Sequence, residues 1–185
     1  PSVKYNGKTV SFMLAREVSF TPDSGEILYT SYLIDEARGT KVTVSNDGAV
    51  TQVRNEIPVL MAVDMQTQAT RVIREEAEYG LYSKNGRYFG YVNYDHRTVT
   101  DPANAAHHYS LALYDTQTKE TKYLTDGLGT RTQAFSFNND ETRVAAAVID
   151  TKNSTPVYSI YIVPIDGGNP VDITWRDNPL SLFSF

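Results

Sequence analysis

The chain has 185 residues, 41% of them hydrophobic, which is enough apolar material for the core of one ordinary domain. A formal net charge of −5 and the lack of any Lys/Arg run argue against nucleic acid as a partner. No apolar run reaches the roughly 20 residues that cross a bilayer, so we expect no membrane insertion. Cysteine is absent, which excludes disulfides and thiolate ligands within the chain and leaves the cellular compartment open.

Short strands with period-two alternation follow one another along the chain. Segments 2–12 and 41–53 each read as a strand, a turn and a second strand, and alternate residues of "YSLALYD" (109–115) fall on opposite faces. The best helical candidate, "TRVIREEAEYG" (70–80), lacks a continuous apolar stripe, so we predict a strand followed by a loop there. The sequence therefore predicts hairpins in series.

An aromatic strand, a polar turn and a second strand recur along the sequence. The aromatic residue before the turn is Phe20, Tyr82 and then Phe137, and "SLFSF" (181–185) reads as a further copy cut short. A later strand of each copy ends in an aspartate, and successive members of the set Asp64, Asp115 and Asp166 are 51 positions apart.

Four strands in each repeat of about 50 residues are typical of a propeller blade. We predict an all-β fold, a β-propeller of four-stranded antiparallel blades, organised as a single propeller segment. The approximate blades are 15–75, 76–127 and 128–175, with partial blades at 1–14 and 176–185. Variable excursions at 34–58, 93–108 and 150–157 separate the second and third strands of each blade.

The chain reads as an incomplete portion, about three to four blades, of a six- to eight-bladed propeller. An open arc leaves strand edges unpaired, which closed propellers avoid. The copies at 2–12 and 41–53 leave no room for the rest of a blade, so we expect segments of the parent protein to be missing near 13–15 and 54–58. Missing blades or a further domain would join the chain covalently or non-covalently.

The repeated segments "SFTPDSGEILYTSY", "YSKNGRYFGYV" and "SFNNDETRVAAAV" resemble the S-P-D-G-K-x-I-A-F repeat of TolB-like, WD40-like (PD40) propellers. The same repeats occur in propeller domains of prolyl-oligopeptidase-type (S9) serine peptidases, and the resemblance covers most of residues 15–185. The copies depart from the pattern at Asn85, where Asp is usual, and at Glu141 and Thr142, which replace Gly-Lys. The resemblance implies a propeller fold and a periplasmic or secreted location.

We expect the repeated residues to have structural roles in such a fold. We expect the aromatic residues Phe20, Tyr82 and Phe137 to pack between neighbouring sheets. The turn residues should bond their own backbone and hold the hairpins, as Asp and Asn side chains do in Asx-turns. These turn residues are Asp23, Asn85 and Asp140.

The sequence carries no recognisable catalytic machinery and implies no cofactor. There is no G-x-S-x-G nucleophile elbow, no phosphate-binding loop motif and no H-E-x-x-H motif. The only histidines, His96, His107 and His108, lie in one excursion with Asp95 and Asp101. Neutral imidazoles and carboxylates could converge on a metal ion there, whereas the alternative is a solvated loop.

Three functional interpretations remain open. The first is a non-catalytic propeller that binds a protein or peptide partner, as TolB-type periplasmic proteins do. The second is a substrate-gating propeller of a prolyl-oligopeptidase-type serine peptidase whose catalytic domain is not in this chain. The third is a metal-dependent, carbohydrate-active propeller centred on the histidine excursion, in the manner of oligogalacturonate lyases.

Overall fold

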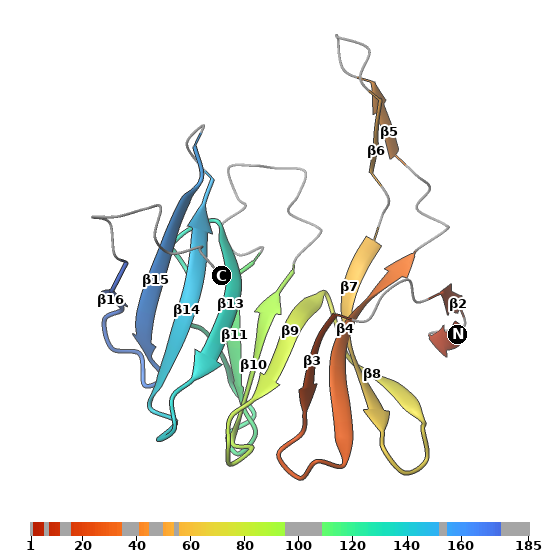
Figure 1. Cartoon of the computed structure of the whole chain (residues 1–185), viewed down its shortest axis with the longest axis horizontal. Helices are drawn as coiled ribbons and strands as arrows, with labels where there is room; N and C mark the ends of the chain where they lie inside the picture. Colours follow the sequence, from red (N-terminus) through yellow and green to blue (C-terminus); the bar gives the residue numbers. More distant parts are fainter. Residues whose placement is uncertain are drawn as a thin grey trace, which may run out of the picture. The chain divides into compact units, whose positions relative to one another are not determined.

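A computed structural model shows sixteen β-strands and no helix among the residues it describes, which confirms the all-β prediction (Figure 1). It describes residues 2–5, 8–11, 16–34, 41–44, 50–53, 56–94, 109–151 and 155–174. Within these ranges no helix is long and apolar enough to cross a membrane. The strands form three four-stranded antiparallel sheets and two hairpins, and the chain divides into two compact units, 1–81 and 82–185.

The first unit is built around one four-stranded sheet and two separate hairpins. The sheet has the order β3-β4-β7-β8, with strands at Arg16–Phe20, Glu26–Ile34, Glu56–Asp64 and Thr70–Glu75. The hairpins pair β1 with β2 and β5 with β6, at Ser2–Tyr5, Lys8–Ser11, Lys41–Val44 and Val50–Val53. Both hairpins lie where the sequence predicted strand, turn and strand.

The core of this sheet follows from strand alternation. Tyr29 lies opposite Met61, and Met61 lies opposite Val72, so these three side chains share one face. Ile57, Val59 and Met61 are buried there, with Tyr29 and Val72 packed against them. β7 is buried on both faces, because Leu60 and Ala62 are also covered.

Two further four-stranded sheets follow along the chain. One has the order β9-β10-β11-β12, with strands at Ala77–Tyr82, Tyr88–Asn93, Leu111–Asp115 and Thr121–Tyr123. The other has the order β13-β14-β15-β16, with strands at Arg131–Phe137, Arg143–Asp150, Val157–Pro164 and Val171–Asp172 (Figure 1). Each sheet is an up-and-down meander of four strands, as predicted for the repeat.

The segment 70–80 differs in part from its prediction. A strand is present at Thr70–Glu75, as expected, but the following residues form a second strand, Ala77–Tyr82, instead of a loop. Only Glu76 separates the two, and its φ of 54° lies in the left-handed region. One residue with this backbone conformation can redirect a chain without a long connection, so the period-two pattern resumes at once.

The core of the second unit lies between the strands β10 and β11, with the residues after β12, and the sheet β13-β14-β15-β16. Leu111, Leu113 and Leu124 from one sheet are buried with Val144 and Val163 from the other. Phe135 and Phe137 of β13 pack against this cluster, and their rings meet edge to face at a centroid distance of 6.0 Å. Phe137 thus packs between sheets as the repeat predicted.

The other two repeated aromatic residues differ in exposure, since Tyr82 is partly buried and Phe20 is exposed. Tyr82 stacks within its own sheet on Phe89, with ring centroids 4.6 Å apart. Phe20 is 59% exposed, so the expectation of inter-sheet packing is wrong for this ring. Phe20 and Phe137 hold the same position in the repeat. The physical reason for the difference is that no described part of the chain covers the Phe20 side of β3.

Gly90 leaves the space that Phe135 fills. A Cβ atom at residue 90 would lie 2.5 Å from Cε2 of Phe135 and 3.3 Å from Cζ of Phe137. Both distances are shorter than ordinary van der Waals contacts, so a side chain at residue 90 would have to displace the rings. A glycine at this place in β10 therefore lets the aromatic strand approach closely.

We expect Gly90→Ala to destabilise the second unit by about 1–3 kcal/mol through overpacking. The measurement is urea unfolding of the whole chain, followed by near-ultraviolet circular dichroism of the aromatic residues. Gly25→Ala is the matched control, because a Cβ there would meet only Asp23, at 3.4 Å or more. Equal stability of the Gly90→Ala and Gly25→Ala variants would contradict the packing described above.

Candidate functional site

A cavity of about 530 Å³ lies in the second unit, where turns that connect the strands from β9 to β14 meet. The turns belong to β9–β10, β11–β12 and β13–β14, and Asp166 follows β15. We call this space the acidic cavity, since five carboxylates and two cationic side chains line it. These charged residues are Asp115, Glu120, Asp140, Glu141 and Asp166, with Arg87 and Lys122.

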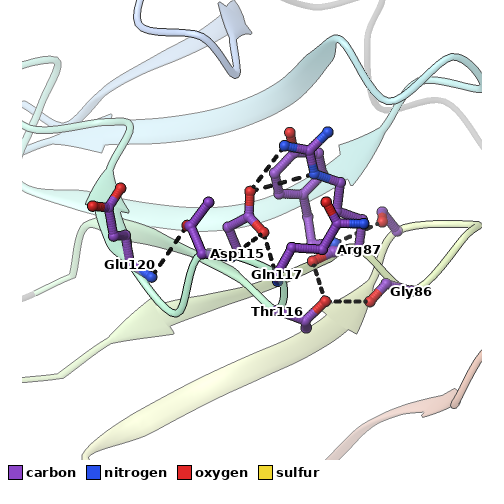
Figure 2. Close-up of polar contacts among 9 residues, drawn as sticks. Gly86, Arg87, Asp115, Thr116, Gln117 and Glu120 are labelled. Atoms are coloured by element: carbon purple, nitrogen blue, oxygen red, sulfur yellow. Dashed lines mark hydrogen bonds and ion pairs between the residues drawn. The ribbon is translucent and has the colours of Figure 1, made fainter.

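An ion pair between Arg87 and Asp115 forms one wall of the cavity, and Figure 2 shows the guanidinium reaching the carboxylate. Arg87 donates from Nε and Nη2 to Oδ2 of Asp115, at 3.3 and 3.1 Å. The Asp115 side chain is 15% exposed and that of Arg87 44% exposed, so the pair is partly shielded from solvent. The guanidinium also lies over the Tyr88 ring, 4.8 Å from its centroid.

The turn after β11 is held by Asp115 and by its neighbour Thr116. Oδ1 of Asp115 accepts hydrogen bonds from the N–H groups of Gln117 (2.8 Å) and Thr118 (3.2 Å). Thr116 Oγ1 donates to the carbonyl oxygens of Gly86 and Arg87 at 3.2 and 2.8 Å, which ties this turn to the β9–β10 turn (Figure 2). Both oxygens of Asp115 therefore have defined partners.

The turn between β13 and β14 forms another wall. Asp140 Oδ1 accepts hydrogen bonds from Thr142 N–H (3.2 Å) and Thr142 Oγ1 (2.6 Å). Glu141, with a left-handed φ of 57°, accepts a hydrogen bond at Oε1 from the Asn85 N–H, at 2.5 Å. This last bond joins the turns of two different sheets across 56 positions of sequence.

Hydrogen bonding holds two of the cavity carboxylates in their ionised form. The Thr142 hydroxyl and N–H lower the pKa of Asp140 below its usual value. Desolvation raises the pKa of Asp115, but the N–H groups of Gln117 and Thr118, together with Arg87, outweigh it and leave a lowered pKa. Both groups are therefore anionic at neutral pH.

The turn residues confirm the structural role predicted for two of them. Asp23 Oδ1 accepts from Gly25 N–H at 3.0 Å, and Asp140 bonds within its own turn. Asn85 departs from this expectation, since its hydrogen bond is made by the main-chain N–H, which donates to Glu141, and not by the side chain. In that turn the Ser83 side chain holds the hairpin instead, because its Oγ accepts a hydrogen bond from the Tyr88 N–H at 3.0 Å.

Sequence reasoning missed a repeated hydrogen bond at the first turn position. The side chains of Thr21, Ser83 and Asn138 each accept the N–H of the residue five positions later, at 3.0, 3.0 and 2.9 Å. The signal was available, because a small polar residue directly follows the aromatic residue in all three copies. The acidic cavity itself had no such signal, since its charges come from separate turns.

The predicted metal-binding residues His96, His107 and His108, with Asp95 and Asp101, lie outside the described residues. The metal site at these positions therefore stays a prediction. Within the described ranges, no group of three or more His, Cys, Asp or Glu side chains is arranged to hold a metal ion.

Comparison with known proteins shows that the chain resembles solved structures but has no detectable relative in sequence. No protein family matches the sequence, and no curated protein matches it. The β-propeller domain of the Trilobed protease from Pyrococcus furiosus, described as having an open velcro topology, superposes with a TM-score of 0.56 at 9% identity. This match covers 88% of the present chain and 44% of the other.

An acylaminoacyl peptidase from Pyrococcus horikoshii superposes with a TM-score of 0.53 at 7% identity, over 88% of the present chain and 25% of the peptidase. The chain thus spans less than half the length of either protein. At these identities the likeness defines the fold. Together with the three four-stranded sheets, it shows that the chain is a portion of a β-propeller.

We expect acid to destabilise the fold as the turn aspartates become protonated. The pKa values of Asp23, Asp64, Asp115 and Asp140 are all lowered in the folded state. A lowered folded pKa adds stability above the unfolded pKa of about 3.9, and this contribution is lost as the pH falls through the folded value. The thermal unfolding midpoint should therefore fall steeply below about pH 4.

Substitution of Asp64 alone tests how much of the acid sensitivity comes from one turn aspartate. Asp64 Oδ1 accepts three hydrogen bonds, from Gln66 N–H, Thr67 N–H and Thr67 Oγ1. Asp64→Ala should lower the midpoint at pH 7, and the gap to the unmodified chain should narrow in acid. A gap that stays constant with pH would contradict the role given to the ionised carboxylate.

Proposed function

We propose that the chain is a non-catalytic β-propeller module that binds a protein or peptide partner through the acidic cavity. The observation that carries this proposal is a cavity of about 530 Å³ with five carboxylates against two cationic side chains, a surplus of three negative charges. Such a surplus favours a positively charged group, so we propose a Lys or Arg side chain or a free amine of the partner as the group bound.

The rigidity of the cavity walls supports a binding role. Asp115 and Asp140 are fixed by hydrogen bonds within their turns, and the Glu141–Asn85 bond holds two turns together. Carboxylates held in place before binding lose little conformational freedom when a cation arrives, which favours affinity. Leu113, Tyr88 and Ile165 add apolar surface for the aliphatic stem of a Lys or Arg side chain.

The resemblance of the repeats to TolB-like propellers fits this proposal, and with it a periplasmic or secreted location. Those proteins are non-catalytic and hold protein partners. The overall negative charge of the chain is also compatible with a basic partner surface.

A second candidate function is a propeller that gates substrate access to a serine peptidase. Two solved structures that superpose with TM-scores above 0.5 are a Trilobed protease propeller and an acylaminoacyl peptidase, which are peptidases or parts of them. The S9 resemblance of the repeats points the same way. On this interpretation the catalytic serine lies on another domain, and the acidic cavity would contact that domain or a peptide substrate.

Binding of basic peptides tests the first proposal. Fluorescence anisotropy should show that labelled tetralysine binds the chain more tightly than tetraserine or tetraglutamate, and that added salt weakens the binding. Glu120→Gln should reduce the affinity about two- to fivefold, as expected for one exposed charge. Glu75→Gln removes the same charge from an exposed position in the other unit and should have no effect. Equal effects of the two substitutions, or no preference for tetralysine, would refute the proposal.

Labelling of the protein from its native source tests the second candidate. A fluorophosphonate probe reacts with activated serines, and the gating function predicts a labelled polypeptide that contains this sequence or co-purifies with it. Because the two functions make different predictions, an unlabelled protein that binds tetralysine would leave only the first.

A further inference from the structure

The turn between β9 and β10 differs from the two equivalent turns in one pair of residues. In all three turns the fourth residue has a left-handed backbone, with φ of 58° at Ser24, 72° at Gly86 and 57° at Glu141. In the same order, its N–H donates to the carbonyl oxygen of the first turn residue at 2.8, 2.9 and 3.1 Å. The same backbone is thus built three times, but only the β9–β10 turn has a glycine at this position, and the residue before it is Asn85.

The side chain of the third turn residue is held in two of the turns and not in the β9–β10 turn. Asp23 Oδ1 accepts hydrogen bonds from Gly25 N–H and Thr21 Oγ1, at 3.0 and 2.7 Å. Asp140 Oδ1 likewise accepts hydrogen bonds from residues of its own turn. The Asn85 side chain makes no hydrogen bond to any residue that the structure describes, and Asn85 is exposed. Its amide group is therefore accessible and free to rotate.

We propose that Asn85 is a site of spontaneous deamidation, which converts it to aspartate or isoaspartate. The main-chain nitrogen of Gly86 attacks Cγ of Asn85, so a C–N bond forms while the bond from Cγ to the amide nitrogen breaks. Ammonia leaves with the proton of the Gly86 N–H. Water then opens the cyclic imide at either of its two carbonyl groups and leaves a carboxylic acid, which ionises. Glycine favours the first step, because no side chain restricts its backbone or shields its nitrogen.

Two hydrogen bonds of the closed turn set the rate of this reaction. The Gly86 N–H is bonded to the Ser83 carbonyl oxygen at 2.9 Å, so the nitrogen attacks only while the turn is briefly open. The Asn85 N–H donates to Glu141 Oε1, which holds the turn from the neighbouring sheet. Exposed turns open locally at a small cost in free energy, whereas each added contact raises that cost. The Glu141 contact therefore slows the deamidation of Asn85.

The aspartate product fits the hydrogen bonds that this turn already offers. A carboxylate at residue 85 has the position of Asp23 in the first turn, where the donors are the N–H two residues later and the hydroxyl of Thr21. The corresponding donors are the Arg87 N–H and the Ser83 hydroxyl. Ser83 is 1% exposed, and its hydroxyl donates to no residue in the described part of the chain. A carboxylate is a stronger acceptor than an amide oxygen, so the aspartate form completes the turn.

Deamidation also adds charge beside the acidic cavity, and this consequence rests on the proposed binding of cationic groups. Asn85 is bonded to Glu141, which lines the cavity. One more carboxylate at its rim raises the surplus of three negative charges to four. Asn85→Asp makes the aspartate product directly, and we expect it to bind tetralysine about two- to fivefold more tightly than the unmodified chain.

Peptide mapping by mass spectrometry tests the modification after incubation of the whole chain in mildly alkaline buffer. Chymotrypsin cleaves after tyrosine and releases the peptide 83–88, which separates Asn85 from the other Asn-Gly pair at Asn6. We expect this peptide to gain the mass of an amide-to-acid conversion, and isoaspartate methyltransferase to label part of it. An unconverted peptide 83–88 from the folded chain, at a time when the free synthetic peptide has fully converted, would overturn the proposal.

Two variants test the mechanism. Gly86→Ser is the matched control, because Ser24 adopts the same left-handed backbone in the first turn, and it should slow the conversion at least about tenfold. Glu141→Ala removes the contact that holds the turn and should speed the conversion. Equal rates in the unmodified chain and Gly86→Ser would refute attack by the residue 86 nitrogen, and an unchanged rate in Glu141→Ala would refute the contact's role.

The mass readout involves no ligand, so it separates this proposal from the proposed function. Conversion of Asn85 in a chain that does not bind tetralysine would refute the binding function and support the modification. Equal tetralysine affinity of Asn85→Asp and the unmodified chain, with both binding, would refute the effect of the added charge.

Discussion

The contact between Phe135 and Gly90 is the constraint on which the second unit depends. Without a side chain at residue 90, the aromatic strand β13 approaches the sheet β9-β10-β11-β12 closely enough to bury Leu111 and Leu113. Apolar burial of this kind is the main favourable term in folding, and it needs two sheet faces of matching shape. The same packing brings the turns of both sheets to one place, and the acidic cavity forms there as a consequence.

The turns convert this packing into a fixed arrangement of charge. Thr21, Ser83 and Asn138 close equivalent hairpins with equivalent hydrogen bonds, so the repeat is one of hydrogen-bond geometry as well as of hydrophobic pattern. Asp115 and Asp140 stay ionised because N–H and hydroxyl groups of their own turns surround them. A polypeptide-binding role would use charges that the fold already requires for its hairpins, with Glu120, Glu141 and Asp166 added around them.

The sequence predicts those features that depend on neighbours along the chain. Period-two alternation located the strands, and the spacing of Asp64, Asp115 and Asp166 revealed the four-stranded repeat. Contacts between distant segments could not be predicted in this way. The Asn85–Glu141 bond crosses 56 positions, and the exposure of Phe20 depends on what covers β3 and not on the residue itself. A local sequence pattern does not show which face of a strand another segment of the chain will cover.

The central claim is that successive four-stranded sheets pack face to face through an aromatic strand. Nuclear Overhauser effects in solution test it most directly, between the ring protons of Phe135 and both the Gly90 α-protons and the Leu113 methyl groups. The account predicts strong effects to both partners, because Phe135 packs against Gly90 and the Leu113 cluster. Their absence in the folded chain, with Phe135 instead close to residues of its own sheet alone, would contradict it.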